Sequence, residues 1–164
     1  MARTKPKLRK QPFDGRAFLF FQAITLAIGL IGGVFSRISV LDTLRKPAFM
    51  PTLPVLIGCW LGVHVLMATA AYLVWNSGDL DRALPLRVYL LQTIAHAVWP
   101  ILVFRLQWRL IGFFWTILLA ALVTLTLSGF RYIRPAAYRL LLPCLLWVGA
   151  AAYMSLGLFL LNDI

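Results

Sequence analysis

The sequence predicts an all-α integral membrane protein built as a bundle of five transmembrane helices. Of its 164 residues, 62% are hydrophobic and 13% are charged, and the mean hydropathy is +0.86. Soluble domains carry about a quarter charged residues, so this composition indicates that lipid is the solvent. Five apolar stretches, each about as long as a bilayer is thick, alternate with basic and proline-containing connections.

The first two spans are predicted on either side of a proline-rich connection. A basic tail over residues 1–16 precedes the first span, residues 17–36, whose twenty residues carry no charge and would extend ~30 Å as a helix. The three prolines within residues 37–54 prevent a regular helix there, but Pro54 suits the first turn of the second span, residues 54–75. We therefore expect an irregular loop between these spans.

The remaining spans are predicted over residues 86–104, 110–130 and 140–162. The connection between the third and fourth is very short, residues 105–109, so these two spans should form an antiparallel hairpin. Pro143 falls near the start of the fifth span, where a missing backbone donor is tolerated. The domain organisation expected is thus a basic tail followed by a membrane domain over residues 17–162.

The positive charges indicate the orientation. Of the 16 Lys and Arg residues, eleven fall on the side of the N-terminus and five on the other side. The positive-inside rule places the N-terminus in the cytoplasm and the C-terminus on the opposite side. Because the basic residues lie between apolar runs, we expect them to contact anionic lipid, and we expect no nucleic-acid partner.

Few polar side chains fall inside the spans, and these are the candidate site residues. His64 and His96 each lie about ten residues into a span, ~15 Å along a helix, which places both near the bilayer midplane. Gln92, His96 and Trp99 share one helical face, as do Trp60 and His64. The histidines could ligate a haem iron, or one could hold the magnesium of a chlorin. The alternative is that each hydrogen-bonds a neighbouring helix.

The tryptophans fall into two groups. Trp75 and Trp108 lie at span ends, where interfacial belts prefer them. Trp60, Trp99 and Trp147 lie inside spans and could either line a flat apolar pocket or fill the core. All five acidic residues lie outside the spans, so carboxylate acid–base catalysis, and with it an enzymatic function, is not expected.

Small residues and cysteines also lie inside the spans. Cys59 and Cys144 are predicted to be core thiols rather than a disulfide. Small-xxx-small spacing, which allows close helix approach, occurs in three spans, and we favour contacts within the bundle over contacts between protomers. These pairs are Gly29 with Gly33, Gly58 with Gly62, and Ala151 with Ser155.

Motifs in three parts of the chain occur in a consistent order: Leu44-x-Lys46-Pro47-x-x-x-Pro51, Gln92-x-x-x-His96-x-x-Trp99 and Pro143-x-x-x-Trp147 followed by Asn162. Over residues 17–162 the chain resembles the TspO/MBR family of tryptophan-rich sensory and translocator proteins. The resemblance implies a five-helix bundle, often dimeric, with a pocket beneath the first loop. It implies a porphyrin, haem, sterol or drug-like ligand, bound or transported without catalysis.

The ligand site expected from the residues and the resemblance combines the first loop with spans two, three and five. Its members are Lys46, Pro47, Phe49, Pro51, Trp60, His64, Gln92, His96, Trp99, Trp147 and Ser155. Lys46 at the mouth could attract the propionate groups of a tetrapyrrole.

The chain departs from the family pattern at positions near that pocket. Ala48 and Phe49 replace the loop tryptophans, and histidines replace a Tyr at position 64 and an Asn at position 96. Ser155 stands where the family has Asn. We therefore expect a different ligand selectivity and no photochemical breakdown of porphyrins. Two other functions stay open: a structural subunit of a larger membrane complex, and a protein that holds a His-ligated haem or chlorin.

Overall fold

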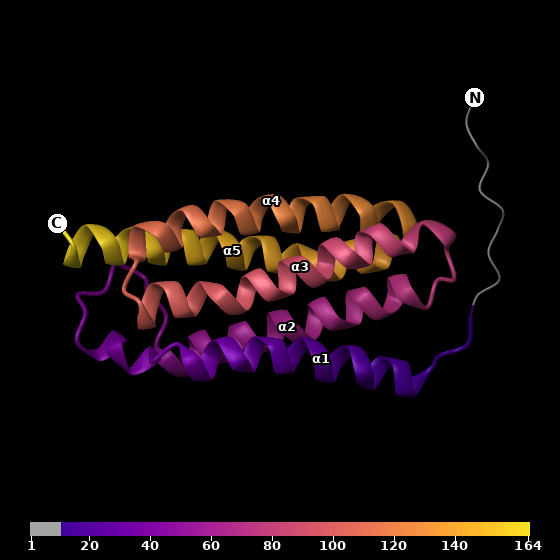
Figure 1. Ribbon diagram of the computed structural model, residues 1–164, viewed down its shortest axis with the longest axis horizontal. Coiled ribbons are helices and arrows are strands. Elements are labelled where there is room, and N and C mark those ends of the chain that lie inside the picture. Colours follow the sequence, from indigo (N-terminus) through magenta and orange to yellow (C-terminus); the bar gives the residue numbers. More distant parts are fainter. Residues whose placement is uncertain (1–10) are drawn as a thin grey trace, which may run out of the picture.

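The computed structural model describes residues 11–164, and these form five long helices and no strand (Figure 1). The helices are α1 (Gly15–Phe35), α2 (Leu53–Trp75), α3 (Ala83–Pro100), α4 (Arg109–Ile133) and α5 (Pro135–Asn162). Each is long and apolar enough to cross a membrane, with α3 extended by the segments on either side of it. The predicted fold class is confirmed. Residues 1–10 of the expected basic tail lie outside the described residues.

The five helices form a closed ring around an interior. α1 packs against α2 and α3, α2 packs against α5, and α4 packs against both α3 and α5. The order around the ring is therefore α1, α2, α5, α4, α3. Figure 1 shows the helices running side by side, with the start of α1 and the end of α5 at opposite ends of the bundle.

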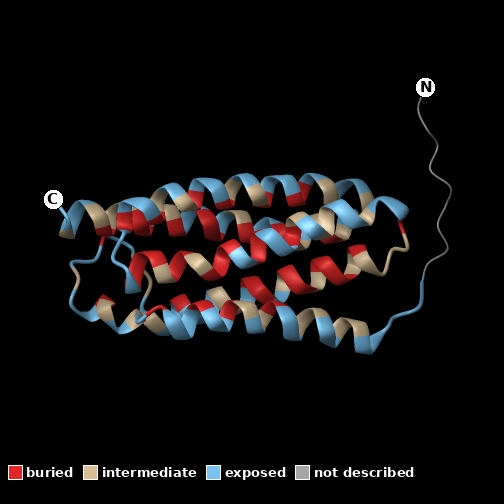
Figure 2. Cartoon of the chain, viewed as in Figure 1, coloured by how far each residue is buried: buried red, intermediate tan, exposed pale blue. Residues whose placement is uncertain are grey.

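The distribution of buried residues agrees with this ring of helices (Figure 2). The inward faces carry the buried residues, whereas apolar side chains such as Leu19, Val34 and Leu146 are largely exposed on the outside. α1 contributes only three buried residues, none of them large. A water-soluble bundle would not leave so much apolar surface uncovered, but in a bilayer this surface faces hydrocarbon.

Local sequence signals fix the two ends of α1. At its start, the Asp14 carboxylate accepts hydrogen bonds from the backbone N–H groups of Arg16 and Ala17, each 3.0 Å long. The backbone N–H of Asp14 in turn donates to the Tyr72 hydroxyl at 2.9 Å, which ties this cap to the end of α2. At its end, Arg37 takes a left-handed conformation with φ of +52° and turns the chain into a short 3₁₀ helix, η1 (Ile38–Asp42).

The connection between α1 and α2 contains no regular α-helix, as predicted, although η1 lies within it. Pro54 occupies the first turn of α2, also as predicted. The third span differs from a simple helix: α3 ends at Pro100 and continues as a π-helix, η3 (Ile101–Arg105). The wider turn is visible in the hydrogen bond from the Leu106 N–H to the Ile101 carbonyl, 2.9 Å long and five residues back.

The turn between α4 and α5 is tighter than the sequence predicted. The fourth span was predicted to end at residue 130 and the fifth to start at residue 140. Instead α4 continues to Ile133 and α5 begins at Pro135, so Arg134 alone connects them, in an extended conformation. The fixed φ of proline is compatible with a first helical turn, which explains the earlier start. Pro143 consequently lies well inside α5 rather than near its start.

Candidate functional site

A cavity of about 270 Å³ lies between α1, α2 and α3, at the end of the bundle that carries the α1–α2 connection. It takes its walls from the last turns of α1, from η1, from the first turns of α2 and from the junction of α3 with η3. The lining residues are Leu30, Gly33, Val34, Ser36, Ile38, Leu56, Ile57, Trp60, Leu61, Trp99, Pro100 and Phe104.

The wall of this cavity is apolar because its few polar groups bond elsewhere. The Ser36 hydroxyl donates to the Gly33 carbonyl at 2.6 Å. The Trp99 indole N–H donates to the Ser155 hydroxyl at 3.0 Å and so points away from the cavity. Gly33 adds no side chain to this wall, and a Cβ there would fit in ordinary contact with the Trp60 ring at 3.7 Å. The cavity therefore offers aromatic and aliphatic surface to a ligand.

One side of the cavity faces the lipid. Val34 of α1 and Ile57 of α2 line it and are 79% and 42% exposed. The opposite wall is deep inside the bundle, where Trp99 and Phe104 are 4% and 1% exposed and pack edge to face at 5.6 Å. A ligand dissolved in the bilayer could thus reach the cavity sideways, between α1 and α2.

His64 lies directly behind Trp60. The two rings are 4.3 Å apart, and His64 Nδ1 hydrogen-bonds the Trp60 carbonyl at 2.8 Å. The other edge of the imidazole is pressed against Gly29, where a Cβ would come within 2.7 Å of His64 Cδ2. The His96 ring follows at 5.9 Å, roughly perpendicular to that of His64. The two predicted histidines therefore do meet in the interior of the bundle, beneath the cavity.

Beyond His96 the interior holds a cluster of sulfur and polar groups. Cys144 Sγ lies 3.5 Å from His96 Nε2, 3.6 Å from Met67 Sδ and 3.6 Å from Gln92 Nε2. All of these side chains are buried, and the predicted Gln92 is among them. Among the described residues, His64 Nε2 and Gln92 Oε1 are buried without a hydrogen-bond partner. The cluster was not predicted, because Met67 and Cys144 are apolar core residues by pattern.

The predicted loop residues lie away from the cavity wall. Phe49 is 98% exposed and has a left-handed backbone, with φ of +58°. Lys46 pairs loosely with Asp42, 4.0 Å away, and both side chains are exposed. Pro47 is buried against Gly157 of α5, where a Cβ would stand 2.6 Å from the Pro47 Cβ. Pro51 is half-buried, just before α2.

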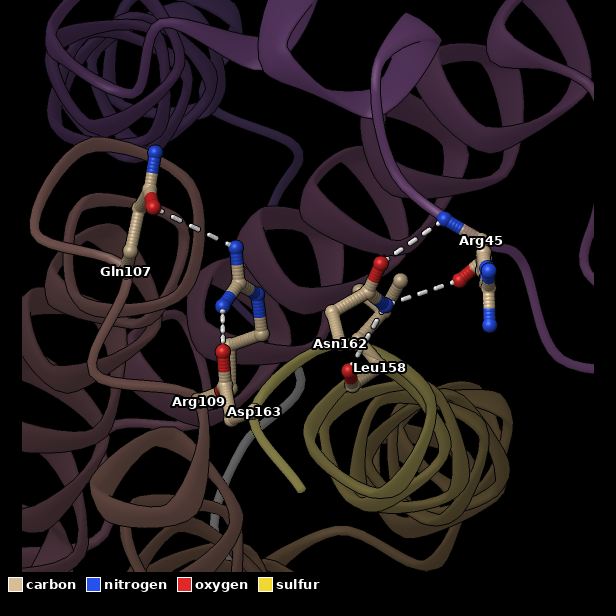
Figure 3. Close-up of polar contacts among 6 residues, drawn as sticks. All are labelled: Arg45, Gln107, Arg109, Leu158, Asn162 and Asp163. Carbon is tan, nitrogen blue, oxygen red and sulfur yellow. Dashed lines mark hydrogen bonds and ion pairs between the residues drawn. The ribbon is translucent and has the colours of Figure 1, made fainter.

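The loop is instead fastened to the last turns of α5 (Figure 3). Asn162 accepts a hydrogen bond from the Arg45 N–H at 2.8 Å and donates one to the Arg45 carbonyl at 2.9 Å. The Tyr153 hydroxyl donates to the Ala48 carbonyl at 2.5 Å. Beside this contact, the Arg109 guanidinium forms an ion pair with Asp163 (Figure 3). These contacts therefore hold the α1–α2 connection against α5 at the end of the bundle that contains the cavity.

The two predicted site residues of α5 lie in different places. Ser155 is buried and is linked to the cavity only through its hydrogen bond with Trp99. Trp147 lines a separate shallow groove on the outer side of α2 and α5, next to Cys59 and Gly62. Cys59 is exposed there, so the prediction that it is a core thiol was wrong, whereas Cys144 is buried as predicted; both thiols are free.

No three His, Cys, Asp or Glu side chains of residues 11–164 gather closely enough to hold a metal ion between them. Of the predicted residues, the structure brings Trp60 and Trp99 together at the cavity and His64, Gln92 and His96 beneath it. The cavity residues missed by sequence reasoning, such as Leu30, Val34 and Ile38, are aliphatic, and hydropathy cannot separate them from lipid-facing neighbours.

Comparison with known proteins agrees with this architecture. The chain is 28% identical over 144 residues to the tryptophan-rich protein TspO of Chlorobaculum tepidum, which covers 85% of this chain and 91% of that protein. It is 32% identical over 124 residues to translocator protein 2 of Canis lupus familiaris, covering 72% and 71%. Identity to the translocator protein of Ovis aries is 28% over 116 residues, 69% of each chain. Residues 21–161 match the sequence model of the TspO/MBR family, and this five-helix membrane protein belongs to that family.

Proposed function

We propose that this protein binds a flat apolar ligand of the tetrapyrrole class in the cavity between α1, α2 and α3. The observation that carries the proposal is the cavity itself, which is apolar and has two indole rings, Trp60 and Trp99, in its wall. Aromatic side chains stack against planar ring systems, so this wall suits a macrocycle better than it suits an extended acyl chain. Binding, with or without transport, is the whole of the proposed activity.

The dimensions of the cavity support partial insertion of such a ligand. Its volume of about 270 Å³ lies just below the ~300–1,000 Å³ typical of small-molecule sites, so only part of a macrocycle would fit inside. A macrocycle would place one edge between Trp60 and Trp99 and leave the rest between α1 and α2, where Val34 and Ile57 are exposed to lipid. We therefore infer that the ligand arrives from the bilayer rather than from water.

The charges of the α1–α2 connection favour a ligand that carries carboxylates. Arg45 and Lys46 lie at the cavity end of the bundle, and the Lys46 side chain is about half exposed. Propionate groups at the membrane surface would meet these cations while the ring remains in the apolar region. A sterol-like ligand would gain nothing from them, which is why we favour a porphyrin.

Tryptophan fluorescence provides the test. We expect protoporphyrin IX to quench the protein in nanodiscs saturably, and we expect Trp60→Leu to weaken binding at least about tenfold, since a buried aromatic contact contributes on the order of 1.4 kcal/mol or more. Trp108→Phe is the matched control, because Trp108 is half exposed and lies outside the cavity. Absence of saturable quenching, or equal affinity of the Trp60→Leu variant, would overturn the proposal.

A second candidate function is that of a subunit in a larger membrane assembly. It is favoured by Gly58 and Gly62, one turn apart on α2, because a Cβ on either would meet no atom within 4 Å. Such a bare small-residue face allows another helix to approach closely. If this face is used, Gly62→Leu should reduce the native mass of the gently extracted protein. An unchanged mass would favour the isolated binding protein.

A haem-holding function has one observation in its favour, the unpartnered His64 Nε2 behind Trp60, although α1 would have to move at Gly29 to admit an iron there. If an iron porphyrin in the cavity is ligated there, the protein should show a Soret band that shifts in a His64→Ala variant. Haem ligation by His64 would be excluded by two results together. The protein would be colourless after extraction from its own membrane, and added haem would give the spectrum of unligated haem.

We also propose that the end of the bundle where α1 begins faces the cytoplasm. Eleven of the 16 basic residues belong to that end or to the tail before it. The positive-inside rule then places the α1–α2 connection and the cavity on the other side. Reaction of an impermeant thiol reagent with a cysteine introduced at Phe49, but not with one introduced at Ser77, in intact cells would support this orientation; the reverse pattern would contradict it.

A further inference from the structure

Two soft sulfur donors and one imidazole meet in the interior of the bundle, from three different helices. Met67 of α2 and His96 of α3 each contact Cys144 of α5 beneath the cavity, and the exposed fractions of the three side chains are 0%, 4% and 2%. Cys144 Sγ is the central atom, 3.5 Å from His96 Nε2 and 3.6 Å from Met67 Sδ. Nothing in the proposed ligand-binding function uses these atoms.

We propose that Met67, His96 and Cys144 form a binding site for a monovalent copper ion. A first-row metal bound to nitrogen at ~2.0 Å and to sulfur at ~2.3 Å holds those two donors roughly 3.5–3.7 Å apart at tetrahedral to trigonal angles. Two sulfurs at ~2.3 Å from one ion stand roughly 3.8–4.0 Å apart by the same geometry. The distance of 3.5 Å from Cys144 Sγ to His96 Nε2 lies in the nitrogen–sulfur range. The distance of 3.6 Å from Cys144 Sγ to Met67 Sδ is a few tenths of an ångström shorter than the sulfur–sulfur range.

The donor types select the metal. Thiolate and thioether sulfur favour Cu(I), whereas Mg²⁺, Ca²⁺ and Mn²⁺ require several oxygen ligands, and none of Met67, His96 and Cys144 supplies one. The third donor is the Met67 thioether, whose sulfur lies 3.6 Å from Cys144 Sγ. Sites that rely on methionine in this way discriminate against harder divalent ions.

Charge selects the oxidation state. Cys144 binds metal as a thiolate, so its proton leaves for water as the copper–sulfur bond forms, and no electron is transferred when the ion arrives as Cu(I). One thiolate, one neutral imidazole and one thioether then enclose a neutral site. A divalent ion in the same place would leave one uncompensated positive charge near the middle of the bilayer, which is costly.

The neighbouring polar groups fit an occupied site better than an empty one. The Gln92 amide N–H points at Cys144 Sγ from 3.6 Å and would stabilise a thiolate. Gln92 Oε1, on the same amide, is buried without a hydrogen-bond partner, as polar groups beside an ion or water site often are. His64 lies between the cavity wall at Trp60 and the His96 ring, so it stands on the path from the cavity to the three donors.

The test is a competition titration with Cu(I) itself. The full chain is purified anaerobically in detergent without a histidine tag, in a Cys59→Ser background that removes the exposed thiol. Titration against the Cu(I) chelator bicinchoninate should show one tightly bound ion per chain. Cys144→Ser should weaken binding on the order of 100-fold or more, because loss of an outer-shell partner alone costs ~10–100-fold. Met67→Leu and His96→Gln should each weaken it too.

A second measurement tests the copper ligands without the ligand-removing variants, so it does not depend on whether those variants fold. X-ray absorption of the loaded Cys59→Ser protein should show mixed coordination, with sulfur at ~2.3 Å and nitrogen at ~2.0 Å. Only nitrogen or oxygen ligands, or Cys144→Ser binding as tightly as its parent, would overturn the copper site. Porphyrin quenching reports on Trp60 and is recorded on the same samples, so failure of the copper site and failure of the proposed ligand cavity are distinguishable.

Discussion

The Asn162 side chain binds both backbone polar groups of Arg45, accepting from the N–H at 2.8 Å and donating to the carbonyl at 2.9 Å. The two residues are 117 positions apart, one in the α1–α2 connection and one in the last turn of α5. A primary amide has both an acceptor and a donor, so it can bond the N–H and the carbonyl of one residue, as a neighbouring β-strand does. The contact explains how an irregular loop with four exposed charges nearby keeps one position over the bundle.

Removing this amide should loosen the loop without unfolding the bundle. For Asn162→Ala we expect roughly 1–2 kcal/mol of lost stability, two net hydrogen bonds at a partly exposed site. Hydrogen exchange at the amides of residues 37–53 should accelerate. The control is Asn76→Ala, which removes a single bond to the Pro12 carbonyl at the opposite end. Equal acceleration of the loop amides in both variants would refute the role of Asn162.

Adding a single methyl group at Gly157 should disrupt its contact with the Pro47 ring and lower the stability of the protein. Because a Cβ at position 157 would lie 2.6 Å from the Pro47 Cβ, Gly157→Ala must displace the loop. We expect a loss of about 1–3 kcal/mol, as in other overpacked sites. Gly149→Ala lies on the same helix in open space and should be neutral or stabilising. Thermal unfolding in detergent compares the two, and a neutral Gly157→Ala would be inconsistent with this packing.

The ion pair of Arg109 and Asp163 should matter more than that of Lys46 and Asp42. Arg109 is 4% exposed, so Asp163→Asn leaves a buried guanidinium without its counter-charge. We expect a loss of roughly 1–3 kcal/mol, below the 3–5 of fully buried pairs because Asp163 is partly exposed. Asp42→Asn breaks an exposed pair at 4.0 Å and should cost under about 0.5 kcal/mol. Unfolding at increasing SDS concentration measures the stability of both variants. If Asp42→Asn lost more stability than Asp163→Asn, the greater importance of the Arg109–Asp163 pair would be contradicted.

Filling the cavity should separate ligand binding from stability. Gly33→Val places methyl groups toward Trp60, which stands 3.7 Å from a Cβ at this position, without meeting backbone. Porphyrin affinity should fall at least about tenfold, equivalent to 1.4 kcal/mol, while the melting temperature stays within a few degrees. Gly62→Val, on the outer face of α2, should leave quenching unchanged. Unaltered affinity in Gly33→Val would place the ligand elsewhere.

The fold could be predicted from sequence because lipid imposes a simple rule. Each uncharged run of about twenty residues must form a helix to satisfy its own backbone, and this rule located all five helices. Their ends were less predictable. Pro135 was expected in a turn but begins α5, and the π-helix after Pro100 has no signal in composition or hydropathy.

The candidate site could be predicted only in part, for a different reason. Trp60 and Trp99 stand out as large aromatics inside spans, and both line the cavity. Phe49 stands where the family pattern has a loop tryptophan, but it is 98% exposed and has a left-handed backbone with φ of +58°, which no sequence motif indicated. The sulfur cluster depends on which faces of α2, α3 and α5 converge, and that is a property of the ring order rather than of any one segment.

The single residue between α4 and α5 has a consequence for how the chain enters the membrane. With only Arg134 between the two helices, no loop separates the end of α4 from the start of α5. We therefore expect the pair to partition into the bilayer together, as one helical hairpin. Its two halves also form the most extensive helix contact in the protein. Because α4 and α5 are the last helices in the chain, the hairpin would then dock as one unit against α2 and α3, which enter the membrane before it.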